Sequence, residues 1–92
     1  MKNYTLNEIV VCPNPFDSVA SIEMKFEKEQ KVSIELMVSD GTIVKKLFKG
    51  EVAPDCTYHY DLDGSEMSSG RYFLKVLTPD HLDFHKIDLI RD

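Results

Sequence analysis

Residues 22–27 of the chain read Ile-Glu-Met-Lys-Phe-Glu, a strict alternation of apolar and charged side chains. Successive side chains of an extended strand point to opposite faces of a sheet, so this alternation gives one apolar face and one charged face. An amphipathic helix would need apolar residues three and four positions apart, and no segment of the sequence sustains that spacing. The stretch therefore predicts a strand half covered by a core.

The same alternation recurs along the whole chain. After residues 32–38, the segment Ser39-Asp40-Gly41-Thr42 supplies turn chemistry, because Asp and Gly tolerate positive φ, and residues 43–48 return as the partner strand. In the last alternating segment, Ile87 and Leu89 share one face. We expect about seven short strands, at residues 8–12, 22–27, 32–38, 43–48, 58–62, 71–78 and 84–90.

Strands of this length, separated by turn signals every 8 to 12 residues or so, are typical of one architecture. The fold is predicted to be all-β, an immunoglobulin-like or fibronectin-like antiparallel β-sandwich. The chain has 92 residues, which leaves space for one domain, expected to span residues 1–92. Pro13 and Pro15 fix φ and lack a backbone donor, so the first strand must leave its sheet or lie at an edge there.

The composition of the chain argues against several classes of function. The formal net charge is −5, which is the wrong sign for a phosphate-binding surface, so nucleic acid is not an expected partner. The longest apolar run, Ile9 to Cys12, is far shorter than a membrane helix of about 20 residues, and we expect no membrane span. A chain this small has little core left for a deep pocket, and no two titratable groups are spaced as an acid and base. No enzyme activity, catalytic residue or cofactor is predicted.

Candidate metal sites also have simpler interpretations. His81 and His85 would span roughly 13 Å in an extended segment, which is too far for two ligands of one ion. The segment Asp61-Leu62-Asp63-Gly64-Ser65 resembles the start of a calcium loop, but the glycine and the final acidic ligand fall at the wrong positions. We therefore expect no bound metal and read the segment as a turn that ends a strand.

Cysteines and aromatic residues are assigned to the interior. Cys12 and Cys56 are expected as small buried side chains, with one disulfide between them as the alternative. An aromatic platform for sugars is the alternative to a core role for the larger rings, but the chain has no Trp and most of these positions face inward. The rings in question are Phe26, Tyr58, Tyr60, Tyr72, Phe73 and Phe84.

Several motifs, taken in order, resemble those of a known family. Val11-Cys12-Pro13-Asn14-Pro15-Phe16 is similar to a Val-Tyr-Pro-Asn-Pro-Phe motif, and Met67-Ser68-Ser69-Gly70-Arg71-Tyr72-Phe73 is similar to a Leu-x-x-Gly-x-Tyr-Phe motif. Between them lie residues 32–36, Gly41 with residues 43–47, and Tyr60-Asp61-Leu62, and residues 85–90 resemble a terminal strand. The chain resembles the type A C-terminal sorting domain of proteins exported by the type IX secretion system.

This resemblance implies a binding role without catalysis. The domain would be recognised by the secretion machinery and would direct an attached N-terminal cargo through the periplasm and outer membrane, for release or anchoring at the cell surface. We expect the last hairpin to be the recognised surface, through strand addition at its edge. The residues expected to form it are Gly70, Arg71, Tyr72, His85, Lys86, Ile87 and Leu89.

Other motif residues have structural explanations. Pro13, Asn14, Pro15 and Phe16 are expected to close one end of the sandwich, with Phe16 as a plug, and Gly41, Asp61 and Gly70 to shape turns and strand ends. Residues 1–8 lack the apolar stretch of a secretory signal, so we expect either an intracellular chain or the tail of a longer precursor. The alternative function is a generic immunoglobulin-like interaction or spacer module.

Overall fold

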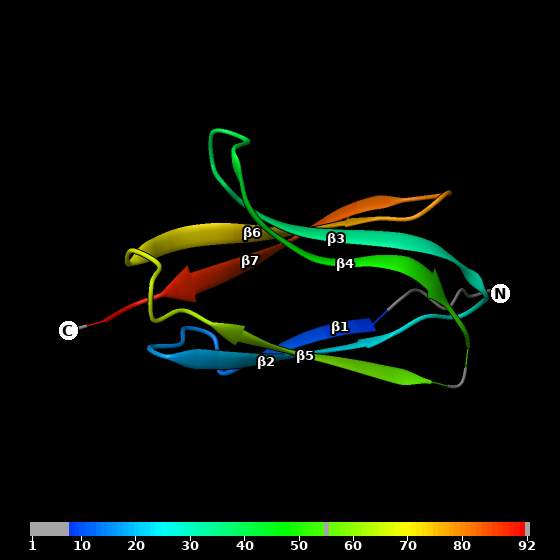
Figure 1. The fold of residues 1–92 in the computed structure, drawn as a ribbon, viewed down its shortest axis with the longest axis horizontal. Coiled ribbons are helices and arrows are strands. Elements are labelled where there is room, and N and C mark those ends of the chain that lie inside the picture. Colours follow the sequence, from blue (N-terminus) through cyan, green and yellow to red (C-terminus); the bar gives the residue numbers. More distant parts are fainter. Residues whose placement is uncertain (1–7, 55, 92) are drawn as a thin grey trace, which may run out of the picture.

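The computed structural model describes residues 8–54 and 56–91, and within them every regular element is a β-strand. Figure 1 shows these strands as two layers. The all-β prediction is confirmed. No helix in the described residues is long and apolar enough to cross a membrane. The strands are β1 (Glu8–Cys12), β2 (Val19–Lys25), β3 (Gln30–Val38), β4 (Ile43–Val52), β5 (Thr57–Asp63), β6 (Gly70–Leu77) and β7 (Leu82–Leu89).

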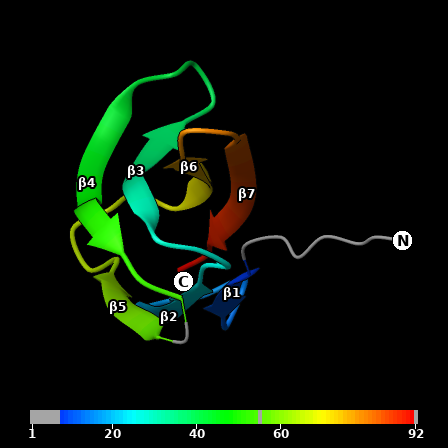
Figure 2. The same cartoon turned by 90° about the vertical axis from the view of Figure 1, so that its right-hand side faces the viewer.

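The two layers are antiparallel sheets that pack face to face. One sheet has the order β1-β2-β5, and the other has the order β4-β3-β6-β7. Viewed along the strands, β7 lies on the same side of the sandwich as β1, and β4 lies on the same side as β5 (Figure 2). The predicted immunoglobulin-like sandwich is confirmed. Each sheet therefore has two edge strands, and β7 is one of them.

The β3–β4 hairpin follows from its turn chemistry. Gly41 has a φ of +94° and donates its N–H to the Val38 carbonyl at 2.9 Å. Hydrogen bonds from the Thr42 side chain and backbone N–H hold the pKa of Asp40 below its usual range. The partner strand β4 is longer than predicted, because residues 49–52 continue in regular register with the start of β3. Two register shifts lie within the predicted part of β4, between Phe48 and Ile43.

The core forms where the alternating apolar side chains of the two sheets meet. Ile22, Ile34 and Leu74 are almost fully buried, and their neighbours along each strand are more exposed. Three aromatic residues, Phe16, Phe26 and Tyr72, belong to this core, and the Phe26 and Tyr58 ring centroids lie 6.1 Å apart. Of the six rings considered for a platform, only Phe84 is exposed, with 51% of its surface accessible.

The expectation for the two cysteines is wrong. Both Cys12 and Cys56 are exposed, and neither forms a disulfide. Cys12 lies on the outward-facing side of β1 together with Glu8 and Val10, and Cys56 lies just before β5. The strand phase and the loop position therefore decide their exposure, against the usual preference of free cysteine for the interior.

One pair of substitutions on β6 tests this assignment of faces. Leu74 is fully buried, whereas 45% of the Leu77 surface is accessible on the same strand. Leu74→Ala should lower the free energy of unfolding by about 2 to 5 kcal/mol through lost burial and a residual cavity. Leu77→Ala should change it by no more than about 0.5 kcal/mol. Urea denaturation measures both, and equal losses would contradict the assigned faces.

Candidate functional site

The segment Pro13–Phe16, which we call the arm, crosses from the end of β1 to the edge of β7. Both of its Xaa-Pro peptide bonds, Cys12-Pro13 and Asn14-Pro15, are cis. The Asn14 side chain donates from Nδ2 to the Lys86 carbonyl at 2.9 Å and accepts at Oδ1 from the Asp88 N–H at 3.0 Å. One side-chain amide thereby takes the place of a neighbouring strand at this part of the β7 edge.

The backbone of Phe16 extends this edge contact. Its N–H donates to the Asp88 carbonyl at 3.0 Å, and its carbonyl accepts from the Ile90 N–H at 2.9 Å. These two hydrogen bonds make Phe16 an isolated parallel bridge partner of Leu89. The ring is 2% exposed and lies within the core cluster. Phe16 therefore fills one end of the sandwich, where a plug was expected.

Gly64, in the β5–β6 loop, lies against this plug. A Cβ at Gly64 would lie 2.9 Å from Cε2 of Phe16 and 3.3 Å from Cδ2 of Leu89, so only glycine fits without movement. Arg91 holds the same loop from outside, because its guanidinium donates to the carbonyls of Gly64 and Met67. Sequence reasoning missed both contacts: Asp-Gly-Ser signals a turn but not a close approach, and Arg91 carried no signal.

The structure brings the expected recognition residues together on the β6–β7 hairpin. Gly70 lies opposite Leu89 and has a φ of +153°, in the region that favours glycine. The Arg71 Nε contacts the Asp88 Oδ1 at 3.0 Å across the pair. The side chains of Tyr72, Ile87 and Leu89 face the core, whereas Arg71 and Lys86 are exposed and His85 is half-buried. Only part of this set is therefore open to a partner's side chains.

Comparison with known proteins identifies the family. The family model described as the secretion system C-terminal sorting domain matches residues 10–88. The chain belongs to this family. Neither a curated protein nor a solved structure matches it significantly. The match runs from the last residues before the arm to Asp88, so it covers the two segments that meet at the β7 edge.

Membership of this family assigns the chain a general function. It is a C-terminal sorting signal of the type IX secretion system, and the family is one of sorting signals, not of enzymes. In the described residues no three His, Cys, Asp or Glu side chains are grouped so that they could hold a metal ion.

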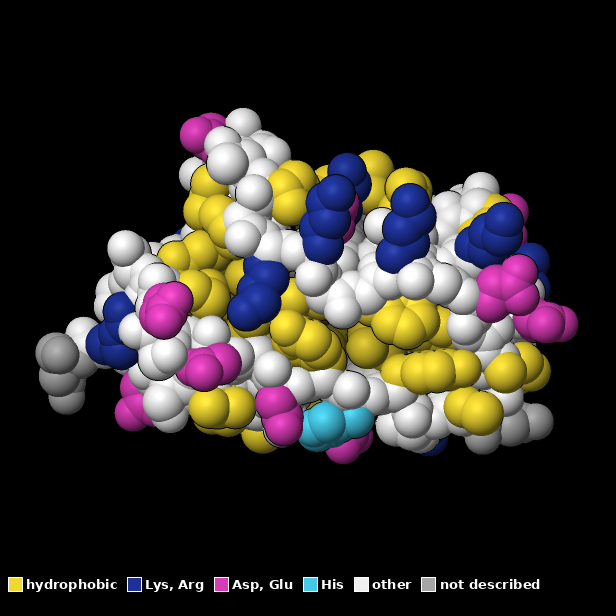
Figure 3. Space-filling view, viewed as in Figure 1, with side chains coloured by type: hydrophobic (Ala, Val, Ile, Leu, Met, Phe, Trp, Pro, Cys, Tyr) yellow, Lys and Arg dark blue, Asp and Glu magenta, His cyan; other side chains and the backbone are white. Residues whose placement is uncertain are grey.

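Two of the motif residues of the sorting domain lie apart from the arm and the hairpin. Gly41 is at the β3–β4 turn, and Asp61 is on the outward-facing side of β5. Asp61 Oδ1 lies 2.7 Å from His59 Nε2 and accepts from the Ser21 hydroxyl at 3.3 Å. Figure 3 shows basic side chains along the upper part of the molecule and a histidine below them. The contact of Asp61 with Ser21 crosses from β5 to β2, the contact with His59 lies along β5, and all three side chains are at the surface.

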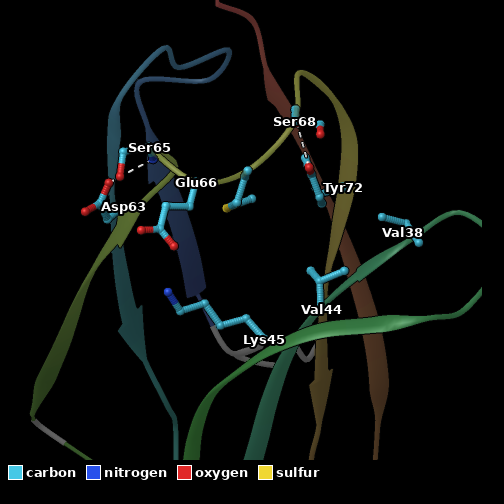
Figure 4. A pocket seen from close by; sticks show the side chains of 9 residues that line it. Val38, Val44, Lys45, Asp63, Ser65, Glu66, Ser68 and Tyr72 are labelled. Carbon is cyan, nitrogen blue, oxygen red and sulfur yellow. Dashed lines mark hydrogen bonds between the residues drawn. The ribbon is translucent and has the colours of Figure 1, made fainter.

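An open cleft of the sorting domain lies between β4 and the β5–β6 loop. It has a volume of about 740 Å³, and Lys45, Glu66 and Tyr72 are among the side chains that line it (Figure 4). Asp63 also lines the cleft, and the backbone N–H of Ser65 donates to its carboxylate. This hydrogen bond, a second one from the Ser65 side chain and the positive charge of Lys45 lower the pKa of Asp63. The cleft holds charges of both signs and is open to solvent.

Replacing Asn14 tests the contact between the arm and β7. Asn14→Ala removes two hydrogen bonds at the strand edge and should lower the free energy of unfolding by about 1 to 2 kcal/mol. The Asp88 amide should then exchange its hydrogen faster, whereas the Ile87 amide, which faces β6, should not change. Asp17→Ala, at an exposed neighbouring position, is the matched control. Unchanged exchange at Asp88 would rule out the contact.

A second substitution tests the close approach at Gly64. Gly64→Ala should destabilise the sorting domain by about 1 to 3 kcal/mol, because the new methyl group meets the buried ring of Phe16. Gly50→Ala is the matched control, since the nearest atom there is 3.7 Å away and both substitutions restrict the unfolded chain equally. Thermal denaturation compares the two, and equal melting temperatures would contradict the packed plug.

Proposed function

We propose that this chain is the non-catalytic tail that delivers an attached N-terminal cargo through the type IX secretion machinery to the outer membrane and the cell surface. The observation that carries this proposal is the family match over residues 10–88. Its partners are proteins of the secretion machinery and the fused cargo. The location that follows for the mature protein is the cell surface or the medium, reached through the periplasm.

The β6–β7 hairpin is the recognised surface in this proposal. It ends in an edge strand, and edge strands present unpaired backbone groups to other proteins. Arg71 and Lys86 are its exposed basic residues, and Gly70 sets the turn at which the hairpin begins. The buried residues Tyr72, Ile87 and Leu89 contribute by fixing the strand positions from which the exposed side chains project.

The arm supports the same surface from the side. Asn14 and Phe16 bind the backbone of Lys86, Asp88 and Ile90, so the last strand is held at its edge as well as by its pairing with β6. A partner would therefore meet a strand that is already ordered, which reduces the entropy lost on binding. The two regions that carry the family resemblance thus act on one element.

An export assay tests the proposed function. The chain is fused to the C-terminus of a reporter cargo that carries an export signal, in a bacterium with a type IX system, and surface reporter is measured. The complete fusion should reach the surface, and deletion of residues 85–92 should stop delivery. Failure of the complete fusion to arrive would overturn the sorting role.

Deletion alone is ambiguous, because it also removes Ile87 and Leu89 from the core. A folded variant, Arg71→Ser with Lys86→Ser, removes two exposed cations from the hairpin and should reduce surface delivery severalfold. Lys25→Ser with Lys49→Ser removes the same charge from β2 and β4 and should have little effect. Equal delivery of the two double variants would show that the hairpin is not the recognised surface.

A further inference from the structure

The edge of β7 is only half covered. The arm bonds to the outward backbone groups of Lys86, Asp88 and Ile90. Backbone groups of an antiparallel edge strand alternate in direction, so Leu82 and Phe84 also direct their N–H and C=O groups outward. In the part of the chain that the structure describes, no hydrogen bond reaches these four groups. We call them the open edge.

The open edge coincides with an exposed apolar patch on the outer face of the four-stranded sheet. Leu82 and Phe84 have 50% and 51% of their surfaces accessible, and Leu77, paired with Leu82, has 45%. Leu77 also lines a shallow groove of about 620 Å³ that continues toward Pro79 and Gly50. Open backbone groups and apolar side chains therefore occur on the same short length of strand.

The open edge is held in place from both ends. At one end the arm bonds to Lys86. At the other, Thr78 closes the β6–β7 turn, because its N–H donates to the His81 carbonyl at 2.9 Å and its hydroxyl accepts from the His81 N–H at 3.0 Å. A strand fixed in this way is prepared for main-chain pairing without further ordering.

Pairing of this edge with a second copy of the chain is disfavoured by charge. An antiparallel two-fold pair that matches Leu82 with Phe84 would set Asp83 directly against its own copy. A shift toward Lys86 would collide with the arm, and a shift the other way would run past Leu82, where β7 begins. A partner with a cation opposite Asp83 has no such conflict.

We propose that the open edge takes an added strand from another protein, supplied as an extended segment in which two apolar residues flank a Lys or Arg. The apolar residues would lie beside Leu82 and Phe84, and the cation would lie beside Asp83. Asp83 has no ion pair with any other described residue, and Lys75 of β6, which is paired with Phe84, lies within 3.9 Å of Glu35. The identification of that protein as part of the secretion machinery rests on the proposed function, but the strand addition itself does not.

A peptide probe tests the proposal on the whole chain. The blocked peptide acetyl-Thr-Val-Lys-Val-Thr-amide is added, and amide hydrogen exchange is followed by NMR. Exchange should slow at Leu82 and Phe84, and the Phe84→Pro variant should abolish the effect, because it removes an outward donor without breaking a bond to β6. Val10→Ser, which alters an exposed apolar residue of the other sheet, should retain binding.

Two further peptides separate strand addition from simple charge attraction. The same peptide N-methylated at both valines keeps its charge but cannot donate from those positions, so it should not bind. Replacing its Lys with Glu should weaken binding by roughly threefold or more. Equal binding of the N-methylated peptide, or protection at sites other than Leu82 and Phe84, would overturn the proposal. A concentration-dependent dimer in sedimentation that Phe84→Pro removes would also overturn it, since the occupant would then be a second copy.

The export assay keeps this inference distinct from the proposed function. If Phe84→Pro abolishes both peptide binding and surface delivery, the added strand comes from the secretion machinery, which supports the whole proposal. If Phe84→Pro abolishes peptide binding while delivery is normal, the assignment to that machinery is overturned. If the complete fusion is not delivered but the peptide still protects Leu82 and Phe84, the sorting role fails and the strand-addition site stands.

Discussion

The contact of Phe16 with Leu89 and Gly64 joins parts of the chain that no short-range interaction would bring together. Phe16 follows the first strand, Leu89 ends the last one, and Gly64 lies in the loop between β5 and β6. The ring closes the end of the core between the two sheets, and its backbone bonds to the edge of β7 on the same side. Because one residue provides both the plug and the edge contact, the position of β7 depends on the segment that follows β1.

The strands and their faces could be predicted because the signal is local. Alternation in residues 22–27 and 32–38 fixes which side chains face inward once the segments are extended, and Leu62, Leu74 and Ile87 follow the same rule. Turn residues such as Gly41 were equally local signals. The β4 boundary was missed because Lys49-Gly50-Glu51 contains no apolar side chain, although these residues pair regularly with β3.

The candidate site could be predicted only in part, because it depends on pairs that are distant in sequence. The Pro-Asn-Pro-Phe motif indicated a fixed segment, but nothing in it specified that Asn14 would bond to the backbone 72 and 74 residues later. The requirement for glycine at residue 64 came from a ring that approaches from another part of the chain. The two cysteines were predicted wrongly for a local reason. The general preference of free cysteine for the interior suggested burial, but the phase of β1 and the loop before β5 leave both side chains exposed.

An edge strand used for recognition must remain available to one partner and closed to others, and the arrangement at β7 meets both needs. A fully open edge of eight residues with Leu82 and Phe84 exposed would invite pairing between copies. The arm already bonds to the half of the β7 edge toward Leu89, so a second copy cannot pair there. At the other half, the pairing of two copies would bring their Asp83 carboxylates together, and the like charges repel. What is left is too short for stable pairing through backbone bonds alone. A partner must therefore also match the two apolar side chains and the charge between them, so specificity comes from side chains while the backbone supplies the geometry.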